Sequence, residues 1–359
     1  MRKLASKRLI WLDRQVQRVE HALQMAAGRR RNRRGSKRQR SRTCIIGIPA
    51  ILTAEKLEHR LKILDVIRQI DDRMAVGGWR VKLDFSRVQK IFPGGMLLLL
   101  AALQQRTQNH PGKIVARCPP NSMAAQLLNH FEMANALGVP QCQPTAHSVV
   151  SWRHLSGTHA DGQELKQLLD HYRTTTKAQI PDELFAVLSE GLTNVRQHAY
   201  TASTTTQNEW KRWWLFARCE EPSSTQNGNL YIAIYDMGVG IPATLRQKLE
   251  KKEIAFDWWD QMLQTVRLSE GTKLDQRLLQ AAVEDRRSQT GQPHRGNGLP
   301  EMREFAVSTE GGRLHIVSGH AQYSLIGGKN DGQITRFEQK FPGTLLLWGL
   351  PLTTKENSI

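Results

Sequence analysis

Long hydrophobic runs are missing from this chain of 359 residues. Its longest apolar stretch, from Met96 to Leu103, has eight residues, whereas a helix needs about 20 to cross the hydrocarbon core of a bilayer. The basic N-terminus also lacks an apolar core followed by a small-residue cleavage site. We therefore expect no membrane span, no secretory signal and no membrane partner.

Cysteine is scarce as well. The four residues, Cys44, Cys118, Cys142 and Cys219, form no Cys-x-x-Cys pair, and no histidine stands beside them at a zinc-site spacing. We expect ordinary thiols in a reducing compartment, which predicts a cytoplasmic location. Hydrophobic residues make up 39% of the chain, enough at this length for two packed domains rather than a disordered chain.

Acidic residues are scarce chiefly at the start of the chain. Residues 1–43 contain 15 Lys and Arg against 2 Asp and Glu, which accounts for +13 of the formal net charge of +18. Apolar residues at spacings of three and four predict a helix with one apolar seam in this segment: Leu9, Leu12, Val16, Val19, Leu23 and Ala26. The seam fits a coiled coil that would make a homodimer, and equally an amphipathic helix packed on its own domain.

An arginine-rich arm follows this helix. Nine of the fourteen residues 29–42 are basic: Arg29, Arg30, Arg31, Arg33, Arg34, Lys37, Arg38, Arg40 and Arg42. Such a density of like charge repels itself, so we expect the arm to be disordered when free. Guanidinium groups pair with phosphate oxygens, and we favour DNA or RNA as the partner; an anionic protein or lipid surface and a plain solubilising linker are the alternatives. The arm has no interleaved aromatic residues, so we expect contact with phosphates rather than base stacking.

The segment 44–150 alternates strand and helix patterns. Residues 81–86 and 113–116 are predicted strands, and residues 94–105 and 121–137 are predicted helices. This β-α-β-α order, with an Asp at the end of the first of these strands, resembles the STAS domain of anti-sigma-factor antagonists. The resemblance implies a module that binds a protein partner. That family carries a phosphate-accepting Ser or Thr at the start of the helix, whereas residues 91–96 here have no hydroxyl group.

Polar residues recur every four positions on a predicted helix over residues 181–200. The three residues are Glu190, Asn194 and His198, and this spacing places them along one stripe of the helix. A carboxylate, an amide and an imidazole together suit metal and phosphate chemistry. A solvated polar face is the alternative interpretation of the same pattern.

Two glycine motifs follow. Residues 229–235 alternate as a strand and lead into Asp236, Gly238 and Gly240, where the chain can turn sharply beside a flat ligand, or form a tight turn with no ligand. Later, Gly296-Asn297-Gly298 precedes a predicted helix that starts at Leu299, and the backbone N–H groups at such a helix start can bind an anion. The Lys-Ser/Thr pair of a P-loop is missing, so any phosphate site has a different architecture.

Taken in order with Gly343-Thr344, these motifs resemble the N, G1, G2 and G3 boxes of the GHKL ATPase superfamily, which has the Bergerat fold and includes gyrase and sensor histidine kinases. The likeness covers about residues 160–354 and implies ATP and Mg²⁺ as ligands. It implies that Glu190 is the general base, Asn194 the Mg²⁺ ligand and Asp236 the residue that recognises adenine. It further implies nucleotide contacts from His198, Gly238, Gly240, Ile241, Gly296, Asn297, Gly298, Leu299 and Thr344.

The expected architecture is thus an α/β and α+β protein, with a STAS-like domain followed by a GHKL α/β sandwich that has a mixed sheet and helices on one face. We expect the boundaries to be 1–43 for the basic helix and arm, 44–150 for the STAS-like domain, 151–180 for a linker and first helix, and 181–354 for the ATP-binding domain, with a helical insertion over 243–294.

The expected function follows from the resemblance and leaves three alternatives. The first is a nucleotide-controlled switch or slow ATPase that regulates engagement of a partner. The second is a serine/threonine protein kinase acting on a partner protein, because the Glu-x-x-x-Asn-x-x-x-His-Ala-Tyr form is most similar to anti-sigma-factor kinases. The third is a scaffold that binds ATP without chemistry.

Overall fold

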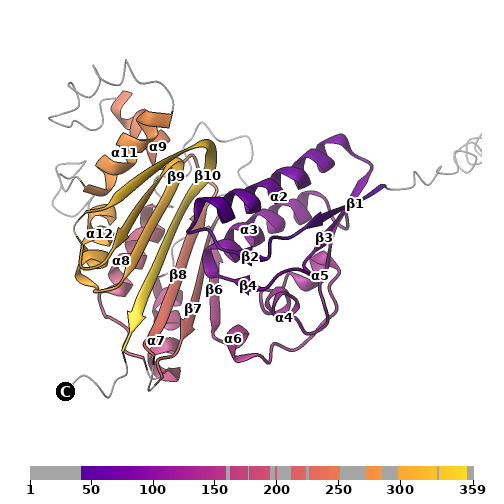
Figure 1. The fold of residues 1–359 in the computed structure, drawn as a ribbon, viewed down its shortest axis with the longest axis horizontal. Coiled ribbons are helices and arrows are strands. Elements are labelled where there is room, and N and C mark those ends of the chain that lie inside the picture. Colours follow the sequence, from indigo (N-terminus) through magenta and orange to yellow (C-terminus); the bar gives the residue numbers. More distant parts are fainter. Residues whose placement is uncertain are drawn as a thin grey trace, which may run out of the picture.

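The computed structural model describes residues 42–158, 162–176, 178–194, 199, 212–223, 226–250, 272–284, 298–329 and 331–353. These residues form a mixed α/β fold, as the sequence predicts at the level of class. Figure 1 shows two units side by side, an N-terminal unit over residues 42–150 and a C-terminal unit over residues 151–353. None of the helices in the described ranges has both the length and the apolar character needed to span a membrane.

The N-terminal unit has a three-stranded parallel sheet in the order β1-β3-β5. Its elements are β1 (Arg42–Gly47), β2 (Ile51–Leu52), α2 (Leu57–Val76), β3 (Trp79–Asp84), β4 (Lys90–Ile91), α3 (Pro93–Asn109), β5 (Ile114–Arg117), α4 (Met123–His130), α5 (Ala134–Leu137) and α6 (His147–Val150). Strands β2 and β4 form a separate parallel pair. The two predicted strands correspond to β3 and β5, and the helix predicted over 94–105 lies within α3.

The helix predicted over residues 121–137 is wrong as a single element. Helix α4 ends at His130, α5 begins at Ala134, and Glu132 between them has a φ of 59°. A right-handed helix cannot pass through this left-handed conformation. The apolar periodicity continues across the break because Phe131 and Met133 are also buried in the same core, and this hides the break from the sequence pattern.

The C-terminal unit has a five-stranded sheet in the order β6-β7-β8-β10-β9. Its elements are β6 (Trp152–Gly157), α7 (Gly162–Thr175), α8 (Leu184–Asn194), β7 (Trp213–Glu220), β8 (Gly228–Asp236), α9 (Ile241–Glu250), α11 (Thr272–Glu284), α12 (Gly298–Ser308), β9 (Arg313–Ile326) and β10 (Gln333–Leu352). The expected mixed sheet is wrong for the described strands, since every neighbouring pair is antiparallel. Strands β8 and β9 do run in the same direction, but β10 lies between them.

The second correction concerns the faces of this sheet. Helices α7, α8 and α12 cover one face, as the expectation of helices on one face requires, but the other face is covered too, by α3 of the N-terminal unit. Alternate residues of each strand therefore face two different apolar cores: on β8, Ile234 packs with the helices and Tyr235 packs with α3. Because both faces of the sheet are buried, strands β7, β8 and β10 have nearly continuous apolar runs.

Helix α3 approaches its neighbours through two glycines at its start. A Cβ atom added to Gly94 would lie 2.5 Å from Leu347 Cδ2 on β10, and one added to Gly95 would lie 2.3 Å from the backbone carbon of Leu52. The end of the Leu347 side chain can shift, whereas the Leu52 backbone cannot, so Gly95 is a position at which only glycine permits this packing. The start of α3 is thus buried between the two units.

Polar contacts also join the two units. The Arg60 side chain on α2 is 1% exposed and donates hydrogen bonds to the Ala54 carbonyl (2.7 Å) and to Gln322 Oε1 on β9 (2.8 Å). Trp214 Nε1 on β7 donates to Gln104 Oε1 on α3 (2.8 Å). The interface therefore has specific polar pairing as well as apolar packing.

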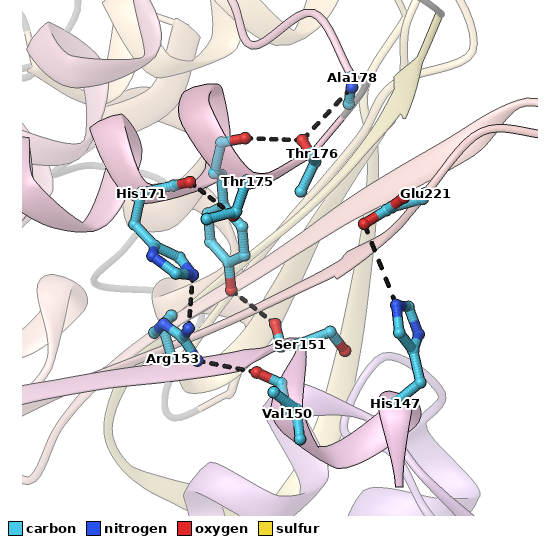
Figure 2. Close-up of polar contacts among 10 residues, drawn as sticks. His147, Val150, Ser151, Arg153, His171, Thr175, Thr176, Ala178 and Glu221 are labelled. Carbon is cyan, nitrogen blue, oxygen red and sulfur yellow. Dashed lines mark hydrogen bonds and ion pairs between the residues drawn. The ribbon is translucent and has the colours of Figure 1, made fainter.

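The segment 151–180, expected to be a linker and a first helix, contains the helix α7 and also a strand, β6. Strand β6 forms one edge of the five-stranded sheet, and α7 packs beside it (Figure 1). Figure 2 shows Arg153 of β6 between the Val150 carbonyl, to which it donates (2.8 Å), and His171 of α7. The Tyr172 hydroxyl donates to the Ser151 carbonyl (2.9 Å). These contacts hold α7 against the junction of the two units.

Candidate nucleotide-binding site

A cavity lies on the face of the five-stranded sheet that α7, α8 and α12 cover. Residues of six elements, together with Ala199 and Gly240, line it. They are Gly191 and Asn194 of α8, Ile234 and Asp236 of β8, Ile241, Thr244, Leu245 and Lys248 of α9, Ala282 of α11, Gly298 and Leu299 of α12, and Thr344 and Leu346 of β10. The structure thus brings together seven of the predicted site residues, which are Asn194, Asp236, Gly240, Ile241, Gly298, Leu299 and Thr344.

Asp236 is a buried carboxylate at the end of β8. It is 2% exposed, and its Oδ1 atom accepts a hydrogen bond from the Gly238 amide (2.7 Å). Burial raises the pKa of Asp236 to about 7, against the opposing effect of hydrogen bonds from the Gly238 and Thr344 amides. A buried carboxylate is costly unless a hydrogen-bond donor meets it. The exocyclic amine of adenine is such a donor.

Ser318 of β9 is a site residue that the sequence motifs do not reveal. Its hydroxyl accepts a hydrogen bond from the Ile241 amide (2.9 Å), donates to the Gly343 carbonyl (3.1 Å), and lies 3.2 Å from Thr344 Oγ1. Ser318 is fully buried. It therefore fixes the start of α9 relative to the Gly343-Thr344 segment, and so fixes two walls of the cavity.

Helix α8 contributes Asn194 to the wall and Glu190 just outside it. The helix begins at Leu184, three residues after the predicted start at Pro181, because residues 181–183 form a turn. Glu190 is half-buried, and burial, followed by the nearby Glu301 carboxylate, raises its pKa. A raised pKa makes a carboxylate a stronger proton acceptor.

Gly298 brings the start of α12 against Glu190. A Cβ atom added to Gly298 would lie 2.2 Å from Glu190 Cγ and 2.3 Å from Glu190 Oε1, so a side chain at this position would displace the carboxylate. The first backbone N–H groups of a helix have no partner within the helix and form an anion site. The general base expected at Glu190 and the phosphate site expected at the start of α12 are therefore adjacent.

Helix α9 supplies three cavity residues that the motifs miss. Thr244, Leu245 and Lys248 lie three, four and seven residues after Ile241. Residues at this spacing share one face of a helix, so one face of α9 is turned to the cavity. The insertion expected over 243–294 thus supplies part of the cavity wall through α9 and α11. Helical spacing counted from the glycine turn at Gly240 is the sequence signal that could have identified these residues.

Several predicted residues lie outside the described part of the chain. They are His198, Gly296 and Asn297 of the nucleotide motifs, and Arg29, Arg30, Arg31, Arg33, Arg34, Lys37, Arg38 and Arg40 of the arm, together with the apolar seam over residues 9–26. Arg42 is described; it is exposed at the start of β1, with its guanidinium carbon 5.9 Å from the centre of the Trp79 ring. Gly238 contacts Asp236 but does not line the cavity.

The chemistry of the cavity suits an adenine nucleotide. Ile234, Ile241 and Leu346 offer apolar walls for a flat base, Asp236 and Thr344 offer polar groups, and Asn194 lies on α8 with Glu190 one turn before it. In the described ranges no three His, Cys, Asp or Glu residues gather as a metal cage. Mg²⁺ is commonly held by one or two protein oxygens together with phosphate and water, and the Asn194 side-chain oxygen fits that role.

No protein-family model matches the chain, and comparisons with curated proteins and with solved structures return no match either.

Proposed function

We propose that this protein binds ATP with Mg²⁺ in the cavity between β8, β10, α8, α9 and α12, and that it acts as a nucleotide-controlled switch or slow ATPase of the GHKL type. One observation carries the proposal: a buried carboxylate, Asp236, lies in the same cavity as Asn194 and the glycine start of α12. This arrangement supports a site in which Asp236 recognises the base while Asn194 and the start of α12 receive the metal and the phosphates.

Each residue has a role in this proposal. Asp236 and Thr344 hold the adenine edge, with Ser318 fixing the segment that carries Thr344. Asn194 offers its carbonyl oxygen to Mg²⁺, which neutralises phosphate charge when bound. The amides at the start of α12, from Gly298 onward, receive phosphate oxygens. Glu190 accepts a proton from an attacking water molecule.

The site is connected to the N-terminal unit through shared strands. The Tyr235 hydroxyl, on the α3 side of β8, donates to the Pro342 carbonyl (2.9 Å), and Phe341 packs in the N-terminal core. Asp236 and Thr344 are sequence neighbours of these groups. We propose that nucleotide state acts through β8 and β10 on the partners of the N-terminal unit. These partners are a protein bound by the STAS-like unit, nucleic acid bound by the arm over residues 29–42, and a second chain in a homodimer.

A second candidate function, a protein kinase of the anti-sigma type, is favoured by the half-buried Glu190 with its raised pKa beside the proposed phosphate site. Its substrate would be a separate protein, because the start of α3 has no hydroxyl group and is buried. Transfer of labelled γ-phosphate to a protein would support the kinase, whereas release of free phosphate would support the ATPase.

Calorimetric titration of the full chain with ATP, with and without Mg²⁺, tests the binding. We expect saturable binding by the wild type and a loss of about 100-fold or more in Asp236→Asn, because the amide presents an N–H group to the adenine amine and leaves buried polar groups unpaired. Asp331→Asn, an exposed carboxylate outside the cavity lining, is the matched control. Equal affinities of the wild type and Asp236→Asn would overturn the assignment of the site.

A further inference from the structure

One face of the three-stranded sheet is exposed along β1 and β3, whereas Val115 of β5 on the same face lies beside Gly138 at the end of α5. Strands β1 and β3 turn alternate residues toward the helices, and Ile46, Val81 and Leu83 on that side are buried. On the opposite side Thr43 and Arg80 are exposed. Parallel sheets are normally covered on both faces, so an open face is a surface that needs an explanation.

Cations are concentrated on this open face. The strand register pairs Thr43 with Arg80, Ile45 with Lys82, and Asp84 with Arg117. Arg80 and Arg117 are exposed and Lys82 is partly exposed, and we call these three residues the basic face. Within the described ranges none of the three forms an ion pair within 4.0 Å.

Asp84 is the acidic residue on this face, and it is already engaged. Its Oδ1 atom accepts a hydrogen bond from the Ser86 amide (3.0 Å), and hydrogen bonds from Ser86, followed by the nearby charges of Arg117 and Lys82, lower the pKa of the carboxyl group. Arg80 and Lys82 stand two residues apart on one strand, about 7 Å along the sheet, and neighbouring strands are about 5 Å apart. The basic face is therefore a flat group of cations spaced on the scale of neighbouring phosphate groups.

The arginine-rich arm joins the fold beside this face. Arg42 is the last basic residue of the arm and the first residue of β1, and both Arg42 and Arg73 lie over the Trp79 ring, at 5.9 and 5.0 Å from its centre. In Figure 1, β1 and β3 lie on the side of the molecule away from the five-stranded sheet, whose residues line the cavity. By strand alternation Arg42 and Trp79 are turned to the helix-covered side of the sheet, so the arm joins β1 next to the basic face rather than on it. The basic face is separate from the proposed ATP site.

We propose that the basic face, Arg80, Lys82 and Arg117, binds the phosphate backbone of a nucleic acid. Three cations against the single carboxylate of Asp84 give this face a net positive charge, and guanidinium and ammonium groups on a surface complement a polyanion. A lipid surface fits less well, because Ile45, 64% exposed, is the one large apolar side chain exposed on the described part of this face. The inference goes beyond the nucleotide site and does not depend on ATP binding.

Salt-dependent binding of a fluorescent single-stranded RNA and of a DNA duplex to the full chain tests the proposal. We expect the slope of log affinity against log salt to become shallower by about two in Arg80→Gln/Arg117→Gln, one for each lost phosphate contact. Arg336→Gln/Lys340→Gln removes the same charge from two exposed residues of β10 and is expected to leave the slope unchanged. A variant with Arg29, Arg30 and Arg31 changed to glutamine measures the contribution of the arm to nucleic-acid binding separately.

The outcomes separate the alternatives. An unchanged slope in Arg80→Gln/Arg117→Gln overturns the proposal. The proposal is also overturned if this variant loses binding only to phosphatidylserine vesicles or only to an acidic peptide. If the double variant unfolds, Arg117→Gln alone takes its place, with an expected change in slope of about one. ATP affinity is expected to stay at the wild-type value in all these variants, so a failure of the nucleic-acid proposal and a failure of the ATP proposal appear in different measurements.

Discussion

The two faces of the five-stranded sheet are built by alternate residues of the same strands, yet they differ in kind. Tyr235 and Leu345 face α3 and pack in an apolar core, whereas their neighbours Asp236 and Thr344 line a cavity. The α3 face is closed by a helix that is apolar on nearly every side. The cavity face is closed by helices that pack along the sheet, and the cavity lies where α8 ends and where α9 and α12 begin. Helix ends carry unpaired backbone groups, and these are what a charged ligand needs.

Glycines serve opposite purposes on the two faces. On the α3 face, Gly95 lets the helix approach the backbone of Leu52, which has no freedom to move aside. On the cavity face, Gly298 lets α12 approach the end of the Glu190 side chain, which can rotate away. The same substitution should therefore damage stability on one face and the proposed function on the other.

The largest effect is expected from Gly95→Ala. The added methyl group would overlap the Leu52 backbone, and we expect a loss of about 3 kcal/mol in the free energy of unfolding, at the upper end of overpacking costs. Chemical denaturation measures it. Gly47→Ala in β1 is the control, because a Cβ atom there meets nothing within 4 Å. Equal stability of the two variants would contradict the tight packing of α3.

A tenfold effect is expected from pH. Adenine recognition needs the ionised form of Asp236, whose pKa in the free protein is raised by burial to about 7. We expect ATP affinity to fall about tenfold between pH 8 and pH 6, with a proton released on binding below pH 7. Calorimetry in two buffers of different ionisation enthalpy measures both. A flat profile between these pH values would contradict the role of Asp236.

The same carboxyl group should affect the stability of the free protein in the opposite direction. Its pKa is raised from 3.8 to about 7 on folding, so the folded state binds more protons than the unfolded state in that range. The contribution of Asp236 to stability is therefore present at low pH and is lost as pH rises from about 4 to 7, a change of a few kcal/mol at most. Asp236→Asn should remove this dependence, which thermal unfolding at several pH values would detect.

A smaller effect is expected from Gly298→Ala. The methyl group would push Glu190 aside at the start of α12, so we expect Mg-ATP affinity to fall about fivefold while the free energy of unfolding changes by less than about 1 kcal/mol. Gly349→Ala on β10 is the control, since its nearest neighbours lie at an ordinary 3.8 Å. If Gly298→Ala lost as much stability as Gly95→Ala, the proposed difference between the two faces would be contradicted.

The smallest effect is expected from Lys248→Gln. Lys248 is the one cation among the described residues that line the cavity, and it should favour the phosphate charge of ATP. We expect ATP affinity to fall about threefold and adenosine affinity to stay the same, as for a single partly solvated charge. Lys329→Gln, outside the cavity lining, is the control. Equal losses for ATP and adenosine would place Lys248 beside the base instead.

The sequence predicts the parts of this site that short motifs encode. Asp236, Gly240 and Ile241 are consecutive or nearly so, and Asn194 lies one helical turn after Glu190, so local spacing is enough to group them. The mixed α/β class is also predictable, because strand and helix periodicities alternate along the chain. That the separate motifs meet in one cavity followed only from a family resemblance.

Contacts between distant segments are what the sequence could not predict. Ser318 bonds to Ile241, which is 77 residues away in the sequence, and no local pattern marks that serine. The apolar runs of β8 and β10 indicated burial but not that α3 would cover their second face. The break at Glu132 was hidden because the apolar pattern of α4 and α5 continues through it.

The central claim is that Asp236 and the start of α12 contact opposite ends of one nucleotide. A crystal structure of the full chain with Mg²⁺ and a non-hydrolysable ATP analogue measures this directly. The account predicts the adenine amine within hydrogen-bond distance of the Asp236 carboxylate, about 3 Å, and the phosphates beside Gly298 and Asn194. An analogue bound elsewhere, or bound with its adenine away from Asp236, would contradict it.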